Sequence, residues 1–239
     1  MIELRNVAVR TRRTIAPVSF KNINLRIHPR ERLALLGPSK GGLGLILDTL
    51  CAANAPDAGS VIRGSSLSWP IPGNTFLHKH QSFVANTRFI AHLYEMDQRT
   101  FIPKVLELAD VQDLAEERLD HCPSTVRSKF AFALGVSIPF DIYLFTSTNV
   151  GEKKDREKYN EIIADLGRRS GFVIASGSGK VAKPFCEKAY VLDPAGSVLY
   201  DDMDAAMEHL ERLTKRTAKG GEDDEELADD EERVFDDFL

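Results

Sequence analysis

Residues 32–50 impose the strongest constraint on what this chain can fold into. Residues 32–36 are mostly apolar, residues 37–42 contain three glycines, and residues 43–50 repeat apolar side chains three or four positions apart. A short apolar run followed by a glycine-rich turn and a periodic segment is typical of a buried strand that leads into a helix. We therefore predict a strand at 32–36, a turn at 37–42 and a helix at 43–50.

The glycine spacing matches that of a phosphate-binding loop, but the side chains that bind phosphate are missing. Gly37 and Gly42 occupy the two glycine positions of such a loop, where backbone N–H groups surround phosphate and a helix opens with Lys and Ser or Thr. Leu43 stands at the lysine position, and Gly44 and Leu45 stand at the hydroxyl positions. A hydrogen bond to a charged group is worth roughly 1.5–3 kcal/mol, and none of these three residues supplies one. The loop alone favours a strand-to-helix turn without a ligand.

The remaining loop residues leave one alternative open. Lys40 and Gly41 lie inside the loop, and Lys40 comes three residues before Leu43. Its ammonium group would have to curl back over the loop to reach a phosphate. Substitution of the missing lysine by Lys40 is therefore the second interpretation of this segment.

The net charge of −5 conceals two opposed parts. Residues 220–239 hold eleven acids and one base, and the remaining residues hold 30 bases and 25 acids. We therefore predict a mildly basic folded body over residues 1–213 and an acidic, disordered tail over 214–239. The tail ends in apolar residues about one helical turn apart, which indicate either a peptide that docks on a partner or an inert solvating end: Val234, Phe235, Phe238 and Leu239.

Cysteine usage and hydropathy indicate a cytoplasmic protein. The three cysteines are widely spaced, with neither a metal-binding pair nor an even disulfide set. No apolar run approaches the ~20 residues of a membrane span, and the start of the chain reads as a strand rather than a signal peptide. The basic pairs lack interleaved aromatic residues, so we expect no nucleic-acid partner.

Periodicity predicts alternating strands and helices with a helical lobe inserted at about 78–139. We interpret residues 78–80 as a polar loop rather than a metal site, and residues 177–180 as a surface loop. The predicted strands are 2–9, 18–27, 61–63, 67–69, 140–145, 172–176, 189–192 and 197–200. The predicted helical segments are 86–96, 101–109, 111–119, 126–137, 154–169 and 203–213.

The order of these segments resembles the ATP-binding subunit of an ABC transporter, in the branch that exports capsular polysaccharide or O-antigen. The resemblance rests on residues 1–7, 68–70, 88–94, 130–134 and 140–144, and it covers about 1–213. It implies an α/β P-loop nucleotide-binding domain of ABC type, with an antiparallel β subdomain and an inserted helical subdomain.

The resemblance also implies where catalytic groups would stand, and several are absent. The signature Ser-Gly, which binds the γ-phosphate of a nucleotide on the opposite subunit, aligns with Ser124 and Thr125. The metal-holding Asp and the catalytic Glu align with Thr146 and Ser147. Neither of these two residues can steady Mg²⁺ or polarise the attacking water as a carboxylate does.

At two further positions the functional residue of the family is also replaced. The glutamine that senses metal and water falls near His78, and the switch histidine aligns with Gly177. We therefore expect no metal, no cofactor and no phosphoryl transfer, with Mg-ATP as the cofactor of the alternative. The resemblance implies a non-catalytic domain at the inner face of the membrane, as a homodimer or heterodimer with a membrane subunit or an intact ATP-binding subunit. A working exporter subunit that uses Lys40 and His78 is one alternative, and a free-standing interaction adaptor is another.

Overall fold

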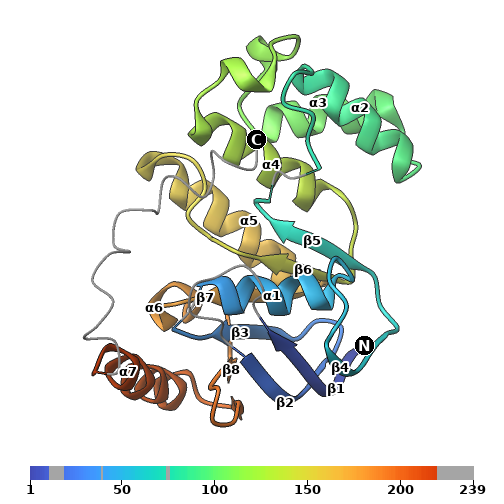
Figure 1. Cartoon of the computed structure of the whole chain (residues 1–239). Coiled ribbons are helices and arrows are strands. Elements are labelled where there is room, and N and C mark those ends of the chain that lie inside the picture. The colour runs from blue at the N-terminus through green and yellow to red at the C-terminus, as the bar shows by residue number, and fades with distance from the viewer. Residues whose placement is uncertain (11–18, 39, 74–75, 220–239) are drawn as a thin grey trace. The chain divides into compact units, whose positions relative to one another are not determined.

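The computed structural model describes residues 1–10, 19–38, 40–73 and 76–219, which form two compact units (Figure 1). The first unit comprises Met1–Pro70, Phe140–Thr148 and the described residues from 160 onwards. The second comprises Ile71–Pro139 and residues 149–159, so it includes the whole of the expected lobe and a second stretch of chain. None of the described helices has the length and apolar character needed to cross a membrane.

A three-stranded antiparallel sheet begins the first unit. Its order is β2 (Ser19–Ile27), β1 (Ile2–Arg10) and β4 (Ala58–Arg63). Leu4 on β1 lies opposite Leu25 on β2, and both side chains are buried. The alternation of apolar and polar residues therefore sets one face of this sheet against the core.

A six-stranded sheet forms the centre of the same unit. Strands β6, β7, β3 and β8 run parallel, and β9 is antiparallel to β8. The central strands are almost completely buried, which explains their continuous apolar sequences. The order of strands is β5 (Leu67–Ile71), β6 (Ile142–Phe145), β7 (Gly171–Ser176), β3 (Arg32–Leu36), β8 (Lys188–Val191) and β9 (Val198–Tyr200).

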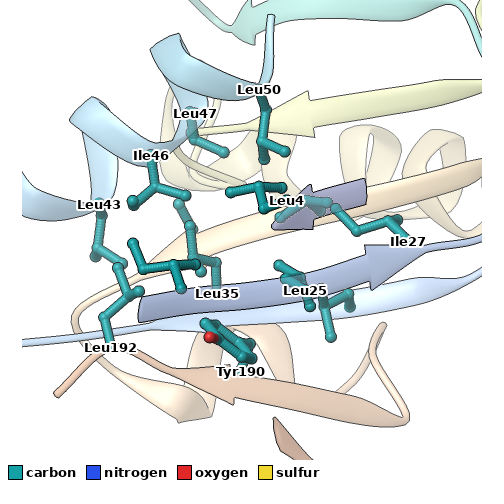
Figure 2. Packing of buried hydrophobic residues seen from close by; sticks show 14 of the residues in the cluster. Leu4, Leu25, Ile27, Leu35, Leu43, Ile46, Leu47, Leu50, Tyr190 and Leu192 are labelled. Atoms are coloured by element: carbon teal, nitrogen blue, oxygen red, sulfur yellow. The ribbon is translucent and has the colours of Figure 1, made fainter. Parts of the chain in front are cut away.

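Helix α1 (Lys40–Leu50) contacts β1 of one sheet and β7 of the other. Its buried residues recur at helical spacing, and Figure 2 shows Leu43, Ile46, Leu47 and Leu50 pointing from α1 into the core. The predicted α/β fold with an antiparallel sheet is therefore confirmed.

Two elements at the end of the first unit differ from expectation. Residues 177–180 were expected to form a loop, but the helical turn α6 (Gly179–Ala182) begins within this segment, and Gly179 lies so close to Met207 that a larger residue would not fit. Helix α7 (Met203–Lys219) continues six residues beyond the predicted end at 213. The added turns carry Lys and Arg, which favour a helix C-terminus.

The second unit is helical. It contains α2 (Phe83–Leu93), α3 (Gln98–Leu108) and α4 (Ser124–Ser137). The 3₁₀ turn η3 (Lys153–Asp155) leads into α5 (Arg156–Arg169), which runs on into the first unit. Perpendicular ring pairs fill the core of the second unit: Phe83 with Phe130 at 4.9 Å and Phe132 with Tyr159 at 5.0 Å between ring centroids.

The prediction of a helix at 111–119 was wrong. The structure has two 3₁₀ turns there, η1 (Gln112–Leu114) and η2 (Leu119–His121). Backbone groups of residues 115–120 instead bond to residues 79–84: Phe83 N–H donates to Glu117 O, and Leu119 N–H donates to Gln81 O. Tertiary hydrogen bonds therefore replace the helical ones that the sequence pattern suggested.

An ion cluster on β1 gives a testable pH dependence. Hydrogen bonds from Arg5 and Arg26, both 2.7 Å long, lower the pKa of Glu3 from 4.5 to about 2. Its stabilising contribution is complete above pH 4.5 and falls as the pH drops towards 2, because the unfolded state takes up the proton first. We expect Glu3→Gln to reduce the urea midpoint at pH 7 and the difference from wild type to shrink between pH 5 and pH 3. A difference that stays constant over this interval would contradict the assignment.

Candidate functional site

Four of the positions singled out in the sequence meet at one edge of the parallel sheet. Gly37 follows β3, Gly177 follows β7, and Thr146 and Ser147 follow β6. These strands are parallel neighbours, so their carboxyl ends share an edge. A Cβ atom at Gly177 would lie 3.7 Å from the carbonyl oxygen of Gly37. This edge is where ligands bind in open α/β sheets.

The connection from β3 to α1 is shorter than predicted. β3 ends at Leu36 and α1 begins at Lys40, three residues before the expected start at Leu43. Gly41 and Gly42 were expected in the turn but belong to the first turn of the helix. The helix therefore extends back into the glycine-rich segment.

The side chain of Leu43 is part of the hydrophobic core. Leu43 is 4% exposed and belongs to the cluster that also contains Leu35 and Leu192. Figure 2 shows its side chain directed from α1 towards Leu192. A Cβ atom at Gly37 would lie 3.4 Å from Leu43 Cδ2 and 3.4 Å from Leu192 Cβ. Apolar atoms thus surround the position where a phosphate-binding loop would hold a cation, and such surroundings disfavour a charged group.

Gly42 packs closely against the aromatic ring of Phe20. A Cβ atom at Gly42 would lie 2.6 Å and 2.9 Å from ring carbons of Phe20, so only glycine fits against this ring. No atom beyond the neighbouring residues and the backbone of α1 lies within 4 Å of the Cβ position of Gly44, and Leu45 is half-buried against the core. Among positions 42–45, Gly44 is therefore the one that would accept a hydroxyl-bearing side chain without displacing a neighbour.

The residues that immediately follow β6 and β7 carry no ionisable side chain. Thr146 is exposed and Ser147 is half-buried, while Gly177 is exposed. The Ser176 hydroxyl donates to Ser178 O at 2.6 Å and accepts from Ser178 N–H at 3.0 Å, which fixes the turn around Gly177. A carboxylate or imidazole would be needed at these places to hold Mg²⁺ or polarise water, so this set of side chains provides neither function.

The other aligned positions lie in the second unit. His78 is exposed, and its ring packs edge-on against Phe89 at 6.4 Å between centroids. Ser124 and Thr125 are exposed in the first turn of α4, where Pro123 provides no side-chain cap. The described side chains contain no group of three or more His, Cys, Asp or Glu that could hold a metal ion.

The structure adds one residue that sequence reasoning missed. Asn86 is 4% exposed on the buried face of α2, and its side chain fixes the loop that contains His78. Its Oδ1 accepts from His78 N–H at 2.8 Å, and its Nδ2 donates to His78 O at 3.1 Å and Ser82 O at 3.0 Å. The available signal was an amide side chain on the apolar stripe between Phe83 and Ile90.

His80 belongs to a cluster of ionisable side chains in the second unit. His80 Nδ1 lies 2.8 Å from Asp120 Oδ2, and Arg118 Nη2 donates to the same oxygen at 2.6 Å. The Arg118 hydrogen bond is the main cause that lowers the pKa of Asp120 to about 2.

The docking residues proposed for the tail, Val234, Phe235, Phe238 and Leu239, lie outside the described residues.

No model of a protein family matches the chain. Several curated proteins have similar sequences. The ATP-binding protein BexA of Haemophilus influenzae is 26% identical over 197 residues, which cover 82% of this chain and 91% of the relative. The polysialic acid transport ATP-binding protein KpsT of Escherichia coli is 28% identical over 74% of this chain and 82% of the relative. The capsule polysaccharide export ATP-binding protein CtrD of Neisseria meningitidis is 24% identical over 80% of this chain and 89% of its own length.

Solved structures agree on the fold. The ATP-binding cassette MJ0796, solved as a dimer bound to ADP and Pi, aligns with a TM-score of 0.69 at 17% identity, over 83% of this chain and 98% of the cassette. A putative metal-chelate type ABC transporter in an inward-facing conformation aligns with a TM-score of 0.67 at 13% identity, over 87% of this chain and 88% of the matched chain. At these identities the likeness establishes the architecture alone.

Proposed function

We propose that this chain, a homologue of capsule polysaccharide export ATP-binding proteins with the fold of an ABC nucleotide-binding domain, is a non-catalytic component of a polysaccharide-export system. The single observation that carries the proposal is the burial of Leu43 in the core at the position where the resemblance implies a lysine. The chain would keep the architecture of its relatives and serve a structural or regulatory role.

The missing groups have an energetic consequence that supports this proposal. A bound triphosphate needs a lysine near its terminal phosphates, a hydroxyl on Mg²⁺ and a carboxylate near the metal. Leu43, Gly44 and Thr146 stand at these positions. Each lost charged hydrogen bond costs roughly 1.5–3 kcal/mol, about one to two orders of magnitude in affinity. Losing several together would weaken binding far below what an exporter subunit requires.

Calorimetric titration with Mg-ATP tests the proposal. We expect no binding in the micromolar range and no phosphate release above the rate without protein. BexA of Haemophilus influenzae, measured in the same buffer, is the positive control. Micromolar binding with turnover would overturn the proposal, and its loss in Lys40→Ala would instead support a working site that uses a substitute lysine.

Dimerisation would not rescue catalysis. The MJ0796 cassette was solved as a dimer. The resemblance to ABC transporters implies that each composite site joins the loop of one subunit to the signature of the other. With an intact ATP-binding subunit as partner, one site would contain Leu43 and the other would contain Thr125, whose β-branched side chain hinders the close backbone approach that glycine permits.

An exposed apolar face on α2 supports a protein partner. Phe89 is 52% exposed, Leu93 is 62% exposed and Tyr94 is 36% exposed, and the first two are four residues apart on one face of the helix. His92 and Arg88 on the same helix are also exposed. Large apolar side chains grouped on a helix surface are typical of a docking surface. We assign this face to the membrane subunit of an exporter.

Substitutions on this face should abolish association without unfolding the chain. We expect Phe89→Ser with Leu93→Ser to abolish co-purification with the membrane subunit of its exporter, because the apolar contact area is lost. Leu114→Ser is the matched control, since Leu114 is 37% exposed elsewhere in the same unit. If the chain never co-purifies with an integral membrane protein, the adaptor alternative is favoured.

A further inference from the structure

We propose that a cavity between the β8–β9 hairpin and helix α7 binds a phosphoryl oxyanion. The cavity has a volume of about 310 Å³, which exceeds the size of a phosphate group. It is lined by Asp193, Tyr200, His209, Arg212, Leu213 and Arg216. All six residues belong to the first unit.

One face of α7 supplies the positive charge. His209, Arg212 and Arg216 recur at helical spacing along the cavity wall. Guanidinium groups four residues apart on a helix are neighbours, and each presents planar N–H donors that suit the oxygen atoms of a phosphoryl group. The two arginines outnumber the one carboxylate of the lining, so the cavity carries a net positive charge.

Asp193 positions two of these side chains. It is 7% exposed, and burial alone would raise its pKa. Hydrogen bonds from Ala195 N–H at 2.8 Å, from His209 Nε2 at 3.3 Å and from Arg216 Nη2 at 2.8 Å reverse this effect, so the pKa of Asp193 is lowered. The ionised carboxylate therefore orients His209 and Arg216 at the edge of the cavity.

Tyr200 completes the arrangement. Its hydroxyl lies 3.0 Å from His209 Nδ1. If His209 Nε2–H donates to Asp193, then His209 Nδ1 accepts the hydrogen bond from the Tyr200 hydroxyl. This tautomer of His209 is assigned from the hydrogen-bond network. Asp193, Tyr200, His209 and Arg216 are thus tied together and would account for a purely structural connection between α7 and the hairpin.

Arg212 is not needed for such a connection. Its exposed side chain forms no hydrogen bond or ion pair with another residue in the described part of the chain. An arginine that lines a polar cavity without an acidic partner is available to an anionic ligand. Arg212 therefore separates the two roles: it should matter for anion binding and be unimportant for the stability of α7.

Titration with inorganic phosphate tests the inference. Binding is followed by calorimetry at constant ionic strength, with NaCl replacing phosphate in the reference. We expect Arg212→Gln to weaken phosphate binding about tenfold or more while leaving the melting temperature in NaCl unchanged. Arg212→Lys should give an intermediate affinity, because it keeps the charge and loses the planar donors. Arg168→Gln, on an exposed face of α5, is the matched control and should bind as the wild type does.

A second ligand identifies the source of the phosphoryl group. Glucose 1-phosphate binding at least as tightly as inorganic phosphate would assign the cavity to an esterified phosphoryl group, and weaker binding would assign it to free phosphate. The inference is overturned if phosphate does not bind the wild type, or if Arg212→Gln and wild type bind it equally. None of these outcomes depends on whether the chain binds Mg-ATP.

Discussion

Leu43→Ala is expected to lower the free energy of unfolding by about 2–5 kcal/mol. The side chain is 4% exposed and packs among Leu35, Leu192 and the other core residues, so its removal leaves a cavity that the two sheets and α1 cannot close. Urea unfolding followed by circular dichroism measures the change. The effect would show that the side chain at position 43 is used for packing.

Gly44→Ala is the matched control for this experiment. The two residues are neighbours on α1, but no atom beyond the neighbouring residues and the backbone of α1 lies within 4 Å of the Cβ position of Gly44. The added methyl group should be neutral or stabilise the helix by about 0.5–1 kcal/mol, because glycine is unfavourable within helices. If Leu43→Ala costs no more than Gly44→Ala, the side chain of Leu43 does not fill the core and the argument for an apolar plug fails.

Asn86→Ala is expected to lower the free energy of unfolding by about 1–3 kcal/mol and to release the loop at residues 78–82. The substitution removes the acceptor of His78 N–H and the donor to His78 O and Ser82 O, so these partly buried backbone groups lose a partner. Hydrogen exchange should show the largest gain at the His78 amide, because local opening then no longer breaks a hydrogen bond there.

Thr87→Val provides the comparison for Asn86→Ala. Thr87 is also fully buried on α2, but its hydroxyl bonds to Phe83 O within the same helix. Its loss should leave the exchange rate of the His78 amide unchanged. Equal rates at His78 in wild type and Asn86→Ala would show that Asn86 does not hold the loop.

The sequence predicted elements best where local pattern and tertiary environment agree. β3 was predicted at 32–36 and is found at Arg32–Leu36, because a short apolar run in the centre of a parallel sheet has no competing structure. The predicted helix at 111–119 failed for the opposite reason. Its periodicity was compatible with a helix, but hydrogen bonds to residues 79–84 from a distant part of the chain replaced the helical ones.

The candidate site was predictable as a set of residue types and not as a geometry. The sequence by itself determined that Leu43, Thr146 and Ser147 carry neither a cation nor a carboxylate, because this is a property of the residues alone. Only the tertiary structure decided that α1 begins at Lys40 and that Leu43 lies in the core. Helix ends and side-chain burial depend on contacts with Phe20 and Leu192, which are distant in sequence and are brought to α1 by the packing of two sheets.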